Sequence, residues 1–281
     1  YYQGKFFTVW GASKNVNPDL RWEKGVNWNV GLDFSLFDNR ISGSVNYYNR
    51  TQKDLLGDYN VSIPPYLFST TFVNVGTMKN SGVEVELHGR IFDKKDFSYD
   101  VSLVGSTMDN RFISFSNSDY KGQKYYYVAP TEDPFPFHYL QRIQEGERVG
   151  NFYMWKYAGL NSDGEWVIYD KNGEYKAGMD ATDEDMYVVG NGLPKFTASW
   201  SNYLKYKNLD LSIYFRGAFG FEIFNIHEFY YGIPGMTSNV MKTAYTKNAN
   251  IKENPLVCDY FIERGDYLKL DMVTIGYTIP L

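Results

Sequence analysis

The feature that most constrains the fold of this chain is a strict alternation of apolar and polar residues, arranged in paired runs. Successive side chains of a β-strand point to opposite faces, so a period of two predicts strands. A tight turn between two such runs predicts an antiparallel hairpin. Three pairs carry the pattern: 27–37 with 41–47, 83–91 with 97–103, and 196–204 with 209–215. A last strand is expected at about 267–279, where a phase switch between Met272 and Val273 predicts a β-bulge.

The placement of charge within these runs is as informative as the alternation itself. Every charged residue falls on the polar phase: Asp33, Arg40, Glu84, Glu86, Arg90, Asp100, Lys195, Asp210 and Arg216. A Lys or Arg that faces lipid at mid-membrane costs roughly 2–4 kcal/mol, so this partition suits a transmembrane β-barrel. A soluble β-sandwich also alternates, with its apolar face in a core, so periodicity leaves both architectures open.

The connections between the runs favour the barrel. The turns inside the pairs are short, whereas the stretches at about 51–80, 112–194 and 221–266 are long and irregular. Loops longer than about 12–15 residues are uncommon in compact soluble domains. Short turns on one side and long extracellular loops on the other are typical of outer-membrane barrels. Runs of about ten residues, tilted near 45°, also match an apolar band of about 25 Å.

Composition excludes two other classes of protein. The formal net charge is −5, and the chain contains no Lys/Arg-rich stripe, so we expect no nucleic-acid partner. No run of about 18 apolar residues exists, so a helical membrane protein is excluded. The single Cys258 cannot form an intrachain disulfide.

Many segments occur in the same order as in one known family. The chain resembles the C-terminal half of the SusC/RagA-type TonB-dependent outer-membrane transporters, over almost its whole length. The segments that carry the resemblance are Asn17–Glu23, Trp28–Phe34, Asn39–Ile41, Tyr47–Arg50, Asp54–Leu56, Asn74–Gly76, Met78–Asn80, Gly82–Glu84, Gly150–Tyr153, Gly190–Phe196, Tyr206–Ser212, Gly265–Leu270 and Val273–Thr278.

The resemblance implies an all-β fold, namely part of a transmembrane antiparallel β-barrel that has 22 strands and a plug when intact. Residues 1–281 are then part of a single barrel domain, with the plug and the last strands absent from this sequence. About eight strands cannot close such a barrel, so both sheet edges should pair with other strands.

The resemblance also implies a function: import of oligosaccharides across the bacterial outer membrane. Oligopeptides are the alternative substrate, and a soluble, secreted carbohydrate-binding β-sandwich is the alternative protein. The implied partners are a SusD-like surface lipoprotein, the TonB complex acting through an absent N-terminal region, and outer-membrane lipid. A dimer of transporter–lipoprotein pairs is expected as well. Neither enzyme activity nor a cofactor is expected.

Aromatic side chains in the long stretches are the candidates for substrate contact, because their rings cover the apolar faces of sugars. They are Tyr125, Tyr126, Tyr127, Trp155, Tyr157, Trp166, Phe229, Tyr230 and Tyr231. The alternative is that these rings pack the loops or contact the lipoprotein. Glu84, Glu86 and Arg90 are expected on the lumen face, where they contact plug or substrate, or are simply hydrated or paired across strands.

No metal site is predicted. Asp163-Gly164 and Asp170–Glu174 faintly resemble a calcium loop, but two turns between short strands explain them better. His88, His138 and His227 lack zinc-ligand spacing.

The barrel and the sandwich make opposite predictions for one set of apolar side chains. In a barrel they face lipid, and in a sandwich they are buried: Trp28, Val30, Leu32, Phe34, Val83, Val85, Leu87, Leu211 and Ile213.

Overall fold

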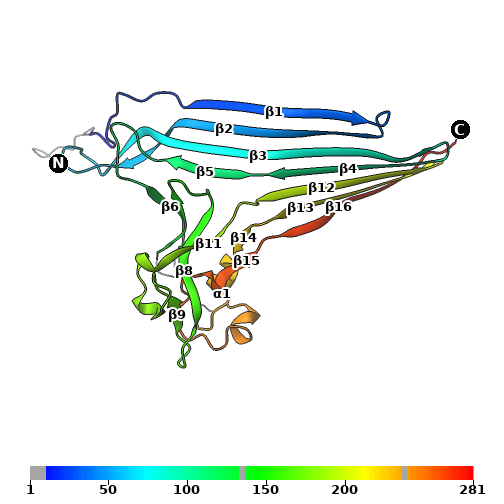
Figure 1. Cartoon of the computed structure of the whole chain (residues 1–281). Helices are drawn as coiled ribbons and strands as arrows, with labels where there is room; N and C mark the ends of the chain where they lie inside the picture. Colours follow the sequence, from blue (N-terminus) through cyan, green and yellow to red (C-terminus); the bar gives the residue numbers. More distant parts are fainter. Residues whose placement is uncertain (1–10, 133–136, 236–238, 281) are drawn as a thin grey trace, which may run out of the picture.

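The computed structural model describes residues 11–132, 137–235 and 239–280, which form two parts (Figure 1). The first is a long single-layer sheet of eight antiparallel strands, in the order β1-β2-β3-β4-β12-β13-β16 with β5 also paired to β3. Its strands are β1 (Lys24–Leu36), β2 (Ile41–Asn60), β3 (Thr70–Lys94), β4 (Phe97–Thr107), β5 (Asp109–Ser114), β12 (Phe196–Tyr206), β13 (Leu209–Phe219) and β16 (Tyr267–Tyr277).

The three predicted hairpins are confirmed as β1–β2, β3–β4 and β12–β13. The turn after β1 has left-handed backbone at Phe37, Asp38 and Asn39, with φ of 54°, 56° and 63°. Asp and Asn tolerate this conformation because their short side chains bond to the local backbone. These residues therefore reverse the chain within a few positions.

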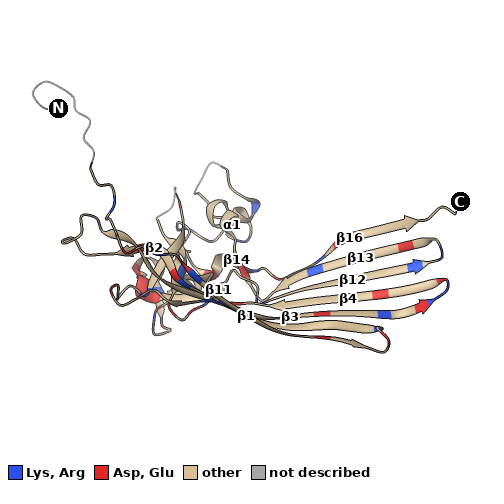
Figure 2. Cartoon of the chain, turned by 90° about the horizontal axis from the view of Figure 1, so that it is seen from above, with Lys and Arg blue, Asp and Glu red and all other residues tan. Residues whose placement is uncertain are grey.

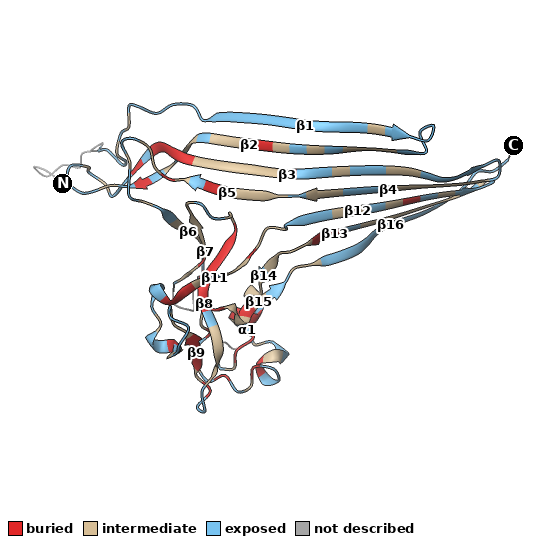
Figure 3. Cartoon of the chain, viewed as in Figure 1, coloured by how far each residue is buried: buried red, intermediate tan, exposed pale blue. Residues whose placement is uncertain are grey.

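The register of the sheet brings the apolar phases of all strands onto one face. Leu87 lies opposite Leu103, Leu103 opposite Trp200, and Trp200 opposite Phe215. No described residue covers this face over most of its length. The sheet is a single layer there (Figure 2), and its outer strands are largely exposed (Figure 3). Leu32 is 66% exposed, and none of the nine apolar side chains that separate barrel from sandwich is buried. The β-sandwich alternative is therefore wrong.

The stretch 51–80, predicted to be irregular, is mostly strand, because β2 and β3 continue to Asn60 and from Thr70. Alternation fails there because a small local core takes up residues of both strands. Its buried members are Tyr59, Val73, Val75, Phe112 and Phe115.

The stretches 112–194 and 221–266 are also more ordered than predicted, and most of their residues form a compact lobe at one end of the long sheet (Figure 1). Its core contains Phe152, Met154, Trp155, Trp166 and Ile168. No described helix is both long and apolar enough to cross a membrane. The elements are β6 (Tyr125–Pro130), β7 (Tyr139–Gln144), β8 (Asn151–Leu160), β9 (Trp166–Tyr169), β10 (Tyr175–Ala177), β11 (Met186–Asn191), β14 (Glu222–Phe224), α1 (Ile226–Tyr231), β15 (Ile262–Arg264) and 3₁₀ turns at Gly178–Asp180, Asp183–Asp185, Lys242–Tyr245 and Asp259–Phe261.

The predicted bulge on β16 exists, but it lies one residue earlier than the phase switch indicated. Phe215 pairs with Leu270 and Tyr214 with Met272, so Asp271 is the extra residue. Met272 is therefore opposite a residue of the polar phase, although its side chain is apolar.

Candidate functional site

The polar face of the long sheet carries the hydrogen-bonding side chains of β1 to β4. Glu84, Glu86 and Arg90 are all exposed there, on the face opposite the apolar one. Arg90 pairs across strands with Asp100 at 3.1 Å, and along its own strand with Asp93 at 3.5 Å. Arg90 is thus paired across strands, which is one of the alternatives left open by the sequence. Glu84 and Glu86 make no ion pair with the described residues.

A cavity of about 430 Å³ lies over β1, β2 and β3. Its polar-phase lining consists of Asn27, Asn29, Tyr48, Arg50, Asn80 and Glu84, and we call this set the amide pocket. Trp28 and Asn49 also line it, although their side chains point to the opposite face of the sheet. The backbone between the polar residues therefore forms the floor of the cavity. Only Glu84 was singled out from the sequence, although all six residues lie in or beside the segments that resemble the family.

Two contacts set the shape of this pocket. Arg50 Nε donates to Asn27 Oδ1 at 3.2 Å. The Tyr48 side chain lies across Gly82, where a Cβ would come within 2.7 Å of the phenol oxygen and 2.9 Å of Cε1. Gly82 therefore allows the tyrosine to lie flat against the sheet.

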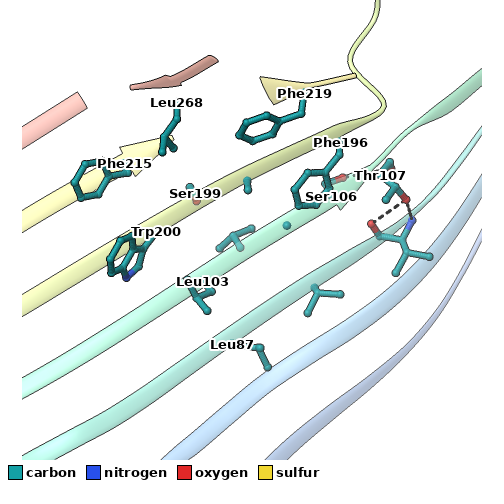
Figure 4. A pocket seen from close by; sticks show the side chains of 15 residues that line it. Leu87, Leu103, Ser106, Thr107, Phe196, Ser199, Trp200, Phe215, Phe219 and Leu268 are labelled. Atoms are coloured by element: carbon teal, nitrogen blue, oxygen red, sulfur yellow. Dashed lines mark hydrogen bonds between the residues drawn. The ribbon is translucent and has the colours of Figure 1, made fainter. Parts of the chain in front are cut away.

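The largely apolar cavity of about 360 Å³ in Figure 4 lies on the other face of the sheet. Two stacked aromatic pairs flank it: Phe196 with Phe219 at 6.1 Å, and Trp200 with Phe215 at 5.4 Å. Ala198 lies between them. This lining offers a polar ligand little to bind, and it suits acyl chains instead.

Three aromatic residues predicted to contact substrate lie in the core of the lobe. Trp155, Trp166 and Phe229 are 4%, 2% and 1% exposed. Trp155 Nε1 donates to the carbonyl of Thr182 at 2.9 Å. Their rings have no surface to offer a ligand, so packing is their role and we remove them from the candidate set.

The remaining aromatic candidates stay at least partly accessible. Tyr127 stacks on Tyr139 at 5.4 Å, and Tyr125 lies 4.9 Å from the Arg142 guanidinium carbon. Burial raises the pKa of Tyr127 and Tyr157, so both phenols are neutral at physiological pH. Tyr126 packs against the core of β2 and β3, Tyr157 and Tyr230 pack against the lobe core, and Tyr231 is exposed.

The two segments that resemble a calcium loop form turns in the structure. Asn161 Oδ1 accepts the backbone N–H groups of Asp163 and Glu165. Asp170 Oδ1 accepts those of Asn172 and Glu174 in the same way. These turns join β8 to β9 and β9 to β10, which is the alternative that the sequence favoured.

Comparison with known proteins gives consistent matches over the whole chain. The family model described as "TonB dependent receptor-like, beta-barrel" matches residues 1–280. TonB-dependent receptor P3 of Formosa agariphila is 28% identical, over 94% of this chain and 28% of that protein. TonB-dependent receptor SusC of Bacteroides thetaiotaomicron is 25% identical, over 94% of this chain and 27% of that protein.

Solved structures agree on the fold. A structure of the RagAB peptide transporter superimposes with a TM-score of 0.76 and 23% identity, over 100% of this chain and 31% of that one. A second structure, of the RagAB peptide importer in an open-open state, gives 0.75. The chain thus spans less than a third of the length of these relatives.

Proposed function

Because this chain belongs to the TonB dependent receptor-like, beta-barrel family, with the barrel fold of SusC and RagA, we propose that the protein imports oligosaccharides across the bacterial outer membrane. In this proposal it is the SusC-like barrel of a SusCD-type complex. The long sheet is then one arc of the barrel wall, and strands outside this sequence pair with β1 and β16.

The observation that carries the proposal is the division of the long sheet into two unlike faces. The uncovered apolar face suits lipid, and the polar face carries a cavity of ligand size. β12 has 11 residues, which span about 33 Å of strand and about 24 Å of membrane at a tilt near 45°. Aromatic residues at both ends of β12, Phe196 and Tyr206, fit the girdles of such a barrel.

The partners follow from the same proposal. The lobe, at the end of the sheet away from the short turns, is placed outside the cell, where a SusD-like lipoprotein would cover it. TonB would act through a plug domain of the full-length protein. We also propose that two transporter–lipoprotein pairs associate.

Sugars are favoured over peptides because the accessible tyrosines of the lobe present ring faces and hydroxyl groups together. Tyr125 and Tyr127 lie two residues apart in β6, on the same face, with ring centroids 5.4 Å apart. Such rings cover the apolar faces of pyranoses, and their hydroxyl groups bond to sugar hydroxyls.

Uptake by whole cells tests the proposal. Cells that express the full-length protein with its lipoprotein are incubated with fluorescent hexasaccharides or fluorescent peptides, and a strain without TonB serves as the control. We expect TonB-dependent accumulation of at least one saccharide. Accumulation of peptides alone would instead identify an oligopeptide importer, and uptake that survives loss of TonB would contradict the family-based mechanism.

A further inference from the structure

The amide pocket contains hydrogen-bonding groups that the protein leaves unused. The Glu84 carboxylate makes no hydrogen bond or ion pair within the described part of the chain, and Arg50 bonds only through Nε. The cavity lining thus includes a carboxylate and guanidinium N–H groups that have no partner among the described residues.

The pocket offers donors and acceptors in balance. Three amides each provide both, the guanidinium provides donors, and the carboxylate provides acceptors. Arg50 and Glu84 carry opposite charges, so the lining of the pocket has no net charge. A neutral ligand whose own groups both donate and accept matches this lining, as hydroxyl groups do.

Tyr48 adds a flat apolar surface to the same lining. Its side chain lies across Gly82 and is half-buried against the sheet. A ring held flat beside amide and charged groups suits a molecule with one apolar face and a rim of hydroxyl groups. A cavity of about 430 Å³ is within the usual size range of small-ligand sites.

We propose that the amide pocket binds a neutral pyranose unit of the transported oligosaccharide, with Tyr48 under the ring and Glu84 and Arg50 on its hydroxyl groups. This inference rests on the proposed import function. It adds sugar contacts on the polar face of β1–β3 to those of the lobe tyrosines.

Calorimetric titration of the full-length complex tests the site. The probes are neutral hexasaccharides of glucose, galactose and mannose, together with short peptides of mixed sequence. Glu84→Gln keeps the shape of the side chain and removes its charge. We expect the Kd for the bound saccharide to rise about tenfold or more, because a charged hydrogen bond is lost.

Glu86→Gln is the matched control, since Glu86 lies two residues further along the same strand and face but does not line the cavity. It should change the Kd by less than about twofold. Tyr48→Ala is a second variant, which removes the ring from the lining without altering charge, and it should also weaken saccharide binding. Unchanged migration of unboiled protein on SDS gels verifies that each variant is folded.

The outcomes separate this inference from the proposed function. Saccharide binding that is weakened by Glu84→Gln and Tyr48→Ala, but not by Glu86→Gln, supports the pocket. Saccharide binding that neither variant weakens overturns the pocket and leaves oligosaccharide import standing. Binding of peptides alone overturns the sugar class for both.

Discussion

Asn74 lies where the segment before β1 crosses the upper part of β2 and β3. Its Nδ2 donates to the carbonyls of Arg21 and Asp54, both at 2.8 Å, and its Oδ1 accepts the N–H of Arg21 at 2.9 Å. Arg21 also pairs with the Asp54 carboxylate at 2.7 Å. Three segments that carry the family resemblance therefore meet here, and the Asn74 amide that joins them is structural.

At the same scale, Asp185 is a buried carboxylate in a charged hydrogen-bond network of the lobe. Its carboxylate pairs with Lys176 at 2.7 Å and accepts the hydroxyl and N–H of Thr182. The Lys176 ammonium and these donors hold the pKa of Asp185 well below its usual range. A depressed carboxyl pKa stabilises the fold above the unfolded-state pKa of about 3.9, and this stabilisation is lost as the pH falls further.

We therefore expect Asp185→Asn to destabilise the lobe by about 2–3 kcal/mol at pH 7, because a charged hydrogen-bond network is lost. The difference from wild type should shrink as the pH falls below about 4. Proteolysis of the lobe, followed across that pH range with an acid-stable protease, measures it. Glu184→Gln, at an exposed neighbouring carboxylate, is the control. An equal effect of both variants at pH 7 would contradict the role given to Asp185.

Residue types alone did not separate accessible from buried aromatic residues. Trp166 and Tyr125 both lie in ring-rich segments, but one is 2% exposed and the other 44%. The difference comes from the lobe sheet, in which β9 is covered by residues 251–261. No local sequence pattern predicts that long-range contact.

At the scale of elements, the strands of the long sheet were predictable because each face meets one environment. The bulge on β16 shows the limit of that signal. Asp271 pairs with Arg216 at 3.1 Å and with Lys269 at 2.7 Å on the polar face. The alternation of apolar residues predicts the bulge beside Met272. The strand register and the ion pairs on the polar face show that Asp271 is the extra residue.

The two-faced sheet makes a sharp prediction for adjacent residues of β13. Ile213→Lys puts a charge on the apolar face and should cost about 2–4 kcal/mol, whereas Ser212→Lys, on the polar face, should cost little. The folded fraction of the full-length protein in unboiled SDS gels, as temperature rises, compares the two. Equal loss from both variants would mean that the apolar face does not meet lipid.

At the scale of the whole molecule, β1 and β16 each have one partner strand within the described residues. Their free edges are 13 and 11 residues long, and unpaired edges beside an exposed apolar face promote association. We expect residues 1–281, produced alone in water, to form large assemblies in size-exclusion chromatography with light scattering. A stable 32.6 kDa monomer would contradict the open-sheet arrangement.

The order of strands was only partly predictable at this scale. Alternation predicts hairpins between neighbours in sequence, but β4 pairs with β12, and β13 pairs with β16. The lobe is formed by the residues between these partners. Both of its segments begin and end at strands of the long sheet. Because the lobe is a folded unit, it holds these strands in register.

The long ladder between β2 and β3 has a structural consequence. It runs from the pair Ile41–Gly89 at the short-turn end to Asn60–Thr70 at the far end, with local shifts around Leu55, and its far half is braced by a core of its own. One pair of strands therefore holds both this core and the side chains of Tyr48 and Glu84, so the amide pocket and the lobe end of the sheet share the same backbone.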